Sequence, residues 1–428
     1  MSERTMQYLI IGLSVLWVIT FCRTKLGKKC VKFVRWTVAE AIFFGLWCLP
    51  RDKSLVAFGS DFGFGGNPKY LYLEMRKRPG YRCVWIAKNK DVYESMKRQG
   101  YDVCMIDSWA GRRVMLRAAT LIHSHSIKED FNYLLVGGAT SVNTWHGVGL
   151  KRSWYRNINA FSGKWLMAEP SLKRSYNLLW ARTNMARENY VIGTSEEVDS
   201  YYPVTYNVPA DHVLNLGQAR NDVFYEYASE EETLPECFKN GKVIVYMPTH
   251  RGYGARRGRQ EKVGMQVDYG KLSKVLAKYG YTMVIKQHSF NTDTKTTKDD
   301  YPNIIDVSRF NYEIDTQLIL KHTDILISDY SSVYTDFLLL DRPIIFYCYD
   351  LEDYLSRWDT NFDYDYVTPG PRAFYSDQLI ERIEQLLQGH DEYEAERQRV
   401  KRVFYSPENQ CPVAAKQVDY IINNIIKR

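Results

Sequence analysis

The residue of this chain best suited to acid–base chemistry is a histidine that follows an apolar segment. His146 comes directly after Thr140–Trp145, a predicted strand, and is followed by Gly147 and Lys151. In open α/β sheets, functional groups sit at the carboxyl ends of strands, where a histidine can take a proton from a hydroxyl. A single histidine is more often structural, but its place beside glycine and lysine favours function. We therefore predict His146 as a general base, with Gly147 and Lys151 as contacts to an acceptor or a loop.

Phosphate-binding groups follow predicted strands in the second half of the chain. Arg251 offers a planar fork of donors and begins a loop with four arginines. His288 follows another strand and could donate to a diphosphate. Ser331 and Ser332 precede a helix whose first turn presents unpaired N–H groups to an anion, and Asp329 lies in the same turn. These residues predict a phosphate cradle; the alternatives are a solvated turn and helix capping alone.

Motifs for nucleotide cofactors and metals are missing. The loop SDFGFGGNP does not match G-x-G-x-x-G, and the chain has no Walker sequence, which disfavours nicotinamide enzymes and P-loop NTPases. We expect this loop to line a cleft, with Asn67 starting the next helix and contacting an acceptor or a loop. His123 and His125 alternate along a predicted strand and so share a face, but a metal needs more ligands. The sequence therefore predicts no metal site and no required cofactor, although a divalent ion could still bridge phosphates.

Short apolar segments alternate with helical ones along residues 54–428, which predicts parallel sheets covered by helices. The predicted strands are Ser54–Gly59, Tyr81–Ala87, Val103–Ile106, Thr120–His125, Thr140–Trp145, Tyr190–Gly193, Lys242–Met247, Tyr281–Lys286, Ile304–Val307, Ile325–Ser328 and Pro343–Tyr347. The polar segment Glu230–Gly241 is the predicted linker. We expect a GT-B-like pair of doubly wound α/β domains, over residues 54–235 and 236–428, with the final helix packing back on the first domain.

Residues 1–53 form a basic and largely apolar leader. Thr5–Cys22 holds no charged residue over 18 positions, barely enough for a helix to cross a bilayer. Basic residues follow it, which places the rest of the chain in the cytoplasm. Lys25–Arg35 predicts a basic amphipathic helix on an anionic membrane surface, and Trp36–Pro50 could re-enter the membrane, lie in its interface or pack on the protein. We expect a single-pass or monotopic anchor on the cytoplasmic face of the cell membrane; a leader packed on the protein itself is the alternative.

The charge distribution agrees with this division. The chain has 57 Lys+Arg and 50 Asp+Glu, a net charge of +7, and 45% hydrophobic residues, which excludes a disordered chain. Nine of the basic and three of the acidic residues lie in residues 1–53, so the remainder is nearly neutral. The surplus charge therefore favours a membrane surface as partner and disfavours nucleic acid.

Several of these segments resemble one known family. The blocks NTWHGVGLKR, VIVYMPTHR, KQHS and SDYSSVYTDFLLLDRPIIFYCYDLEDY, with the weaker NPKYLYLEM and LGQARNDVF, occur in order between Ser54 and Tyr354. They are similar to blocks of the CDP-glycerol:glycerophosphotransferase family of wall teichoic acid synthesis, which includes primases and polymerases. The chain departs from the family pattern at Ser289, where proline is usual. It departs again at Gln218 and Ala219, where tyrosine and proline are usual.

The resemblance implies a GT-B fold and transfer of glycerol phosphate, or a similar polyol phosphate, from a CDP-activated donor. The acceptor would be a hydroxyl of a lipid-linked sugar or polymer, and CMP would leave. The general base of the family falls on His146, and the donor-diphosphate contacts fall on Arg251, His288, Ser331 and Ser332, with Asp329 in the same turn. Residues 236–428 would thus bind the CDP donor, and the chain length favours a primase. A GT-B glycosyltransferase that uses a nucleotide sugar is the alternative, and glycerol and ribitol phosphate both remain open.

Overall fold

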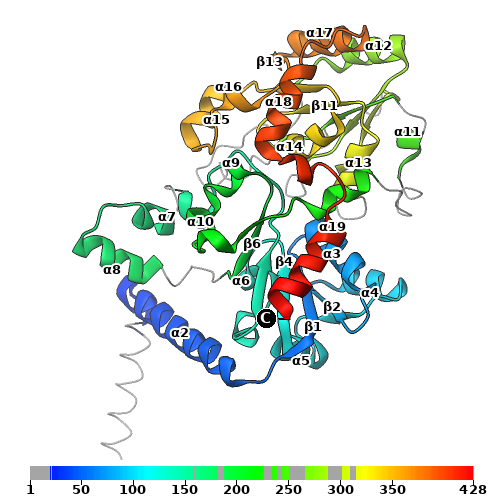
Figure 1. Cartoon of the computed structure of the whole chain (residues 1–428). Coiled ribbons are helices and arrows are strands. Elements are labelled where there is room, and N and C mark those ends of the chain that lie inside the picture. The colour runs from blue at the N-terminus through cyan, green and yellow to red at the C-terminus, as the bar shows by residue number, and fades with distance from the viewer. Residues whose placement is uncertain are drawn as a thin grey trace, which may run out of the picture.

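The computed structural model contains two α/β halves, each built on one parallel sheet (Figure 1). It describes residue 20 and residues 22–157, 161–181, 188–225, 234–239, 242–249, 266–287, 301–308 and 315–427. Arg251 and His288 lie outside the described residues, as does nearly all of the predicted span Thr5–Cys22.

The first half holds a seven-stranded sheet with the order β3-β2-β1-β4-β5-β6-β7. Its strands are β1 (Asp52–Gly59), β2 (Arg82–Ala87), β3 (Val103–Met105), β4 (Ala118–His123), β5 (Thr140–Asn143), β6 (Tyr190–Gly193) and β7 (Val213–Asn215). The last five residues of β1 are all buried, as expected for a strand with helices on both faces of its sheet. The chain reverses its direction of travel across the sheet between β1 and β4, and ligands bind at such switch points.

The second half repeats this topology in a six-stranded parallel sheet with the order β10-β9-β8-β11-β12-β13. Its strands are β8 (Val243–Tyr246), β9 (Thr282–Ile285), β10 (Ile304–Asp306), β11 (Ile325–Ser328), β12 (Ile344–Tyr347) and β13 (Arg372–Ala373). The switch point lies between β8 and β11, which are both fully buried. The two predicted parallel sheets are thus confirmed.

Helices and short turns of helix connect the strands. Those of the first half are α2 (Lys25–Gly45), η1 (Leu46–Cys48), α3 (Gly66–Met75), α4 (Lys90–Arg98), α5 (Trp109–Arg117), α6 (Ile127–Asp130), η2 (Tyr133–Leu135), η3 (Trp154–Arg156), α7 (Phe161–Leu166), α8 (Leu172–Ala181), α9 (Glu196–Asp199), α10 (Tyr202–Tyr206), η5 (Ala210–His212) and η6 (Ala219–Phe224). Local signals set their ends: Asn89 starts α4 by accepting a hydrogen bond from the backbone N of Val92.

The second half contains α11 (Glu236–Lys239), α12 (Tyr269–Tyr279), α13 (Thr316–Lys321), α14 (Val333–Phe337), η11 (Leu338–Leu340), α15 (Leu351–Arg357), α16 (Tyr364–Val367), α17 (Ser376–Leu387), α18 (Glu394–Phe404), η12 (Pro407–Asn409), α19 (Ala414–Ile421) and the π-helix η13 (Ile422–Ile426). Asp268 caps α12, and Gly280 ends it in the left-handed region at φ 72°. These elements cover both faces of the second sheet and return the chain to the first half.

The two halves are joined by more than one segment. The last α-helix, α19, lies beside α3 of the first half (Figure 1). Asp222 caps it by accepting hydrogen bonds from the backbone N of Val413 and of Ala414, both at 2.8 Å. Trp145 of the first half and Tyr334 of the second belong to one buried apolar cluster. The domain boundaries after residues 53 and 235 stay a prediction.

Helix α2 extends beyond the predicted basic segment, from Lys25 to Gly45. Its carboxyl end contacts the protein: Phe43 stacks on Tyr133 at 4.5 Å between ring centroids, and Glu40 accepts a hydrogen bond from the Tyr133 hydroxyl at 2.8 Å. Part of the segment Trp36–Pro50 therefore packs on the first half. Within the part of the chain that the structure describes, no helix combines the length and apolar character needed to cross a bilayer.

Several element bounds differ from those predicted. Strand β4 ends at His123 and β5 at Asn143, so that His125 and Trp145 lie in the loops beyond them. The apolar pattern continues past the point where strand pairing stops, because these side chains pack in the loops of the site. Strands β7 and β13 were not predicted, since segments of three and two residues carry too little periodic signal.

Candidate active site

The loop after β5 carries His146 in an unusual backbone conformation. Trp145 has φ 53° and Gly147 has φ 128°, so left-handed conformations flank the histidine on both sides. Such a conformation is uncommon for a residue with a side chain and is kept only where surrounding contacts determine it. The Asn143 side chain supplies one such contact, because its Oδ1 accepts a hydrogen bond from the backbone N of Trp145 at 2.8 Å.

Asn67 supplies further contacts that hold this loop. Its Nδ2 donates to the carbonyl oxygens of Thr144 at 3.0 Å and of Trp145 at 2.9 Å. Its Oδ1 accepts from the backbone N of Arg220 at 3.0 Å. Asn67 is buried at the start of α3, where the predicted helix begins. It is therefore a loop contact, one of the two roles that the sequence suggested.

The His146 ring lies among aromatic rings. It stacks on His125 with ring centroids 4.5 Å apart and an interplanar angle of 19°. Trp145 and Phe62 approach it at centroid distances of 4.0 Å and 5.7 Å. Burial lowers the pKa of His146 well below its ordinary value, and the charges of His125 and Arg220 act in the same direction. A histidine with a lowered pKa is neutral near pH 7, the form that accepts a proton.

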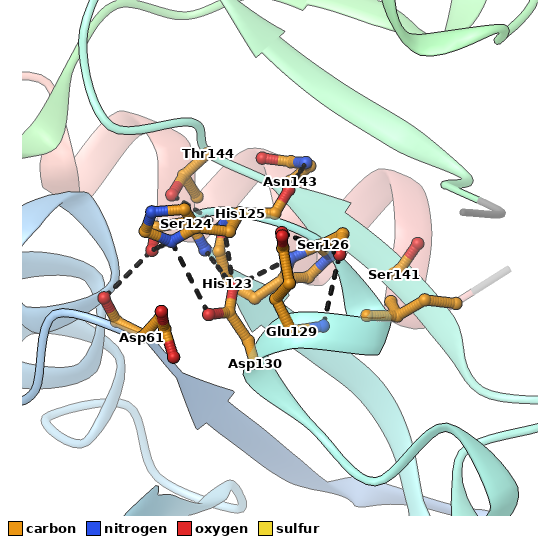
Figure 2. A network of polar contacts seen from close by, with 12 residues as sticks. Asp61, His123, Ser124, His125, Ser126, Glu129, Asp130, Ser141, Asn143 and Thr144 are labelled. Atoms are coloured by element: carbon orange, nitrogen blue, oxygen red, sulfur yellow. Dashed lines mark hydrogen bonds and ion pairs between the residues drawn. The ribbon is translucent and has the colours of Figure 1, made fainter. Parts of the chain in front are cut away.

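A buried network of carboxylates and histidines adjoins this ring (Figure 2). Asp130 accepts from the backbone N of Ser124 at 3.1 Å and of His125 at 2.7 Å. His123 lies between two carboxylates, with Nδ1 at 3.4 Å from Asp130 and Nε2 at 3.0 Å from Glu188. Burial acts to lower the pKa of His123, but Glu188 and Asp130 outweigh it and raise that pKa to about 9. His123 is therefore a buried cation near neutral pH.

Both histidines of this segment lie near Asp130, but His125 is in the loop beyond β4 and not on the strand along which the shared face was predicted. The Nδ1 of His125 lies 3.6 Å from Asp130 Oδ1. Among the described residues, no group of three or more histidine, cysteine or acidic side chains could hold a metal ion. Sequence reasoning missed Asp130 and Glu188, because they come from a short helix and from the segment before β6, and no spacing motif links them to the histidines.

Arg220 ties the His146 loop to the second half. Its Nη1 donates to the His146 carbonyl oxygen at 2.6 Å, and its Nη2 pairs with Asp336 of α14. The Asp336 carboxylate also accepts from Asn221 Nδ2 and Gln317 Nε2, each at 3.0 Å. Arg220, Asn221 and Gln317 were not predicted individually; the only sequence signal for Arg220 and Asn221 was the block LGQARNDVF. Asp336 lies in the block SDYSSVYTDFLLLDRPIIFYCYDLEDY, where the sequence suggested that it tunes the site or binds sugar hydroxyls.

The turn after β11 brings the two predicted serines to the His146 loop. Ser332 is the N-cap residue of α14, without a capping hydrogen bond from its side chain, and Ser331 Oγ accepts from the backbone N of Val333 at 3.5 Å. A Cβ added to Gly147 would lie 3.3 Å from Ser332 Oγ. Gly147, which follows the predicted base, thus meets the predicted phosphate cradle between the two sheets.

Asp329 precedes these serines and is fully buried. Its carboxylate accepts from the backbone N of Thr249 at 2.9 and 3.1 Å and from the Thr249 hydroxyl at 2.7 Å. Because Thr249 follows β8, this contact bridges the switch point of the second sheet. The described hydrogen bonds of Asp329 thus hold the segment that leads to Arg251.

Lys151 lies where the loop after His146 crosses to the second half. Its Nζ is 4.3 Å from the ring centroid of Trp358 and 5.1 Å from that of Tyr354. The Lys151 backbone forms an antiparallel bridge with Thr360. Lys151 is therefore a contact between the two halves at the edge of the site.

Comparison with known proteins agrees with the resemblance. Residues 41–423 match the model of the CDP-glycerol:poly(glycerophosphate) glycerophosphotransferase family. The chain is 28% identical over 378 residues to the teichoic acid poly(ribitol-phosphate) polymerase of Bacillus spizizenii strain W23, a match over 84% of this chain and 56% of that protein. It is 27% identical over 356 residues to the teichoic acid glycerol-phosphate transferase of Staphylococcus aureus, over 80% of this chain and 86% of that protein.

The fold also has a solved counterpart. The structure of the wall teichoic acid polymerase TagF superposes with a TM-score of 0.69 at 23% identity, covering 94% of this chain and 98% of that one. The chain spans only about half the length of the first curated relatives it matches, 56% and 44%. The family model nevertheless covers most of the chain and confirms the resemblance. This chain belongs to the CDP-glycerol:poly(glycerophosphate) glycerophosphotransferase family.

Proposed function

We propose that this protein transfers glycerol phosphate, or a similar polyol phosphate, from a CDP-activated donor to an acceptor hydroxyl and releases CMP. One observation carries the proposal beyond family membership: the loop of His146 and the serine turn of α14 meet between the carboxyl ends of two parallel sheets. A base on one side and anion-binding backbone on the other is the arrangement that phosphoryl transfer needs.

In this proposal, His146 is the general base. Its neutral ring takes the proton of the acceptor hydroxyl as the new O–P bond forms to the β-phosphorus of the donor, and the bond from that phosphorus to the CMP oxygen breaks. The proton stays on His146 until it passes to water. Phosphoryl transfer needs little covalent participation by the protein, so positioning and charge neutralisation do most of the work.

Neutralising the leaving phosphate is assigned to the second half. The first turn of α14, behind Ser331 and Ser332, would offer its unpaired backbone N–H groups to that phosphate. Arg251 and His288, which the resemblance assigns to the donor diphosphate, would supply positive charge there. With these groups no resident cofactor is required.

We further propose that the acceptor is lipid-linked and that α2 lies on an anionic membrane surface at the cytoplasmic face. Three apolar side chains of α2 are strongly exposed: Leu26 is 61% exposed, Val34 58% and Val38 53%. Because they are spaced by eight and then four residues, they lie on one face of the helix. Trp47 at its end is 65% exposed, as expected for an interfacial anchor. The basic residues of Lys25–Arg35 would face anionic lipid headgroups.

The activity is tested with the purified full chain and a lipid-linked acceptor, offered CDP-glycerol, CDP-ribitol and UDP-sugars in separate reactions. We expect CMP release and a phosphorus-containing product with a CDP-polyol and no reaction with UDP-sugars. His146→Ala should lower turnover by about 1,000-fold or more while donor binding persists. His212→Ala, at a histidine that stacks on Tyr190, is the control and should keep wild-type turnover. A phosphorus-free product from a UDP-sugar would show a glycosyltransferase instead.

Membrane binding is tested by sedimentation with vesicles of phosphatidylcholine, with and without phosphatidylglycerol. We expect Trp47→Ser to weaken binding to the anionic vesicles at least threefold, because about 1.5–3 kcal/mol of apolar burial is lost. Trp109→Ser, at an even more exposed tryptophan of α5, is the matched control and should bind like wild type. Equal loss in both variants would show that α2 is not the contact surface.

A further inference from the structure

Among the described residues, no carboxylate contacts the ring of the candidate base. Catalytic histidines are commonly oriented by an acidic group that accepts from Nδ1. Here the Nδ1 of His146 is buried and has no hydrogen-bond partner among the described residues. The ring lies instead among aromatic side chains, and the one whose plane is nearly parallel to it is His125, at an interplanar angle of 19°.

His125 is itself held on several sides. Its backbone N donates to Asp130 at 2.7 Å, and its carbonyl oxygen accepts from Asn143 Nδ2 at 2.6 Å. Its Nδ1 lies 3.0 Å from Ser124 Oγ and 3.6 Å from Asp130 Oδ1. Phe62 packs against it from the opposite loop at a centroid distance of 4.4 Å. The ring is thus locked in place by contacts independent of His146.

We propose that His125 is a positioning residue for the base: its ring fixes the plane of His146 by stacking. The inference rests on the proposed function for the role of His146 as base. In this arrangement the carboxylate of Asp130 lies beside the ring of His125 and not beside the reacting imidazole of His146.

The charges around the pair support this assignment. Asp130 of α6 and His123 of β4 lie close together. Glu188, in the segment before β6, pairs with the other nitrogen of His123. Arg220, on η6, approaches from the carbonyl side of His146 and is neutralised by Asp336. Asp130 thus faces His125, whereas no carboxylate of the residues that the structure describes contacts the His146 ring.

The titration behaviour of the group agrees with the geometry. After burial, the charge of His125 is the next largest influence that lowers the pKa of His146. The Ser124 carbonyl and the Asp130 carboxylate act in the opposite direction. Removing the positive charge of His125 should therefore raise the pKa of His146.

Two variants separate the ring from its charge. His125→Phe keeps an aromatic ring and removes the charge, whereas His125→Gln removes both. In both variants we expect the acid limb of the kcat/KM profile against pH to move up by about one pH unit. Only His125→Gln should also lower the pH-independent kcat, by about tenfold, because it loses the stack that orients the base.

His212→Phe is the matched control. His212 also stacks on an aromatic ring, Tyr190, at a centroid distance of 4.5 Å and an angle of 20°, and its described contacts are with Tyr190 and Asn189 rather than with the His146 loop. Its substitution should leave the pH profile unchanged. Thermal unfolding of each variant shows whether the fold is retained.

A second measurement is independent of turnover. Titration of the ¹³Cε1–H signal of His146 by NMR, assigned by its loss in His146→Ala, reports the pKa of the ring in the protein without substrate. We expect the midpoint to rise in folded His125→Phe and not in His212→Phe. An unchanged midpoint in His125→Phe, or an equal rise in both variants, overturns the inference. If His146→Ala retained turnover, the proposed function would lose its base, while the NMR midpoint would still decide whether His125 controls the ring.

Discussion

Arg220 and Asp336 form a largely buried ion pair that connects the two halves of the protein at the loop of the candidate base. The same guanidinium donates to the carbonyl oxygen of His146 at 2.6 Å. The backbone position of His146 in the first half is therefore coupled to α14 in the second half, the helix that follows the predicted phosphate cradle.

Breaking this pair should cost both stability and activity. Asp336→Asn leaves Arg220 buried without its counter-charge, so we expect the free energy of unfolding to fall by about 3–5 kcal/mol and kcat to fall with it. Asp419→Asn is the control, because it breaks a pair between Arg78 and Asp419 near the surface and should cost less than about 1 kcal/mol. Denaturant unfolding of both variants measures the two changes in the free energy of unfolding. Similar losses in the two variants would contradict a structural role for the pair of Arg220 and Asp336.

The close approach at Gly147 gives a second prediction. Gly147 has φ 128°, and a Cβ there would collide with Arg220 Nη2 and lie 3.3 Å from Ser332 Oγ. We expect Gly147→Ala to lower kcat at least tenfold, because the His146 loop must shift. Gly149→Ala is the matched control: its Cβ would meet only Ser332 Cβ at 3.8 Å, and it should retain near wild-type kcat. Equal kcat values for the two variants would show that Gly147 has room for a side chain beside Arg220 and Ser332.

The hydrogen bonds of Asn67 to the His146 loop give a third prediction. Removing its amide in Asn67→Ala deletes hydrogen bonds to the Thr144 and Trp145 carbonyls and to the Arg220 backbone. We expect kcat to fall about 10–100-fold, because the base is less precisely placed, with little change in KM for the donor. Asn132→Ala, at a half-exposed cap of η2, is the control. A rise in KM without a change in kcat would place Asn67 in donor binding instead.

The buried His123 makes a prediction about stability and pH. Its folded pKa of about 9 lies above the ordinary value of 6.5, so its contribution is fully present below about pH 6.5 and is lost as pH rises through about 9. The stability difference between wild type and His123→Gln should therefore shrink by on the order of 3 kcal/mol over this range. Urea unfolding of both proteins from pH 6 to pH 9.5 measures the difference. A constant difference would mean that His123 is neutral in the fold.

Chelation tests the proposed absence of a resident cofactor. If Arg251, His288 and the first turn of α14 neutralise the donor diphosphate, dialysis against EDTA should change turnover by less than twofold. Readdition of magnesium is the control for chelator effects. A loss of activity that magnesium restores would show that a metal ion shares the neutralisation.

The alternation of apolar and helical segments was sufficient to predict both parallel sheets, because buried strands in such sheets are apolar along their whole length. It also placed His146 and the serines at strand ends, and Asn67 at the start of a helix. It did not indicate the roles of Asp130, Glu188, Arg220 or Asp336, since each gains its partner through contacts with residues distant in sequence. Nor did it reveal that Asp329 holds Thr249 across the switch point, because adjacency of β8 and β11 is a property of sheet order.

The sequence alone determined the family, the two-sheet architecture and the identity of the candidate base, because these depend on local periodicity and on continuous motifs. Only the tertiary structure decided that His125 stacks on His146 and that Arg220 links the His146 backbone to Asp336. It also showed that Gly147 meets Ser332 across the two halves. The physical reason is that the pKa and orientation of a buried ring depend on charges and contacts within a few ångströms, and these neighbours come from segments that the chain brings together only on folding.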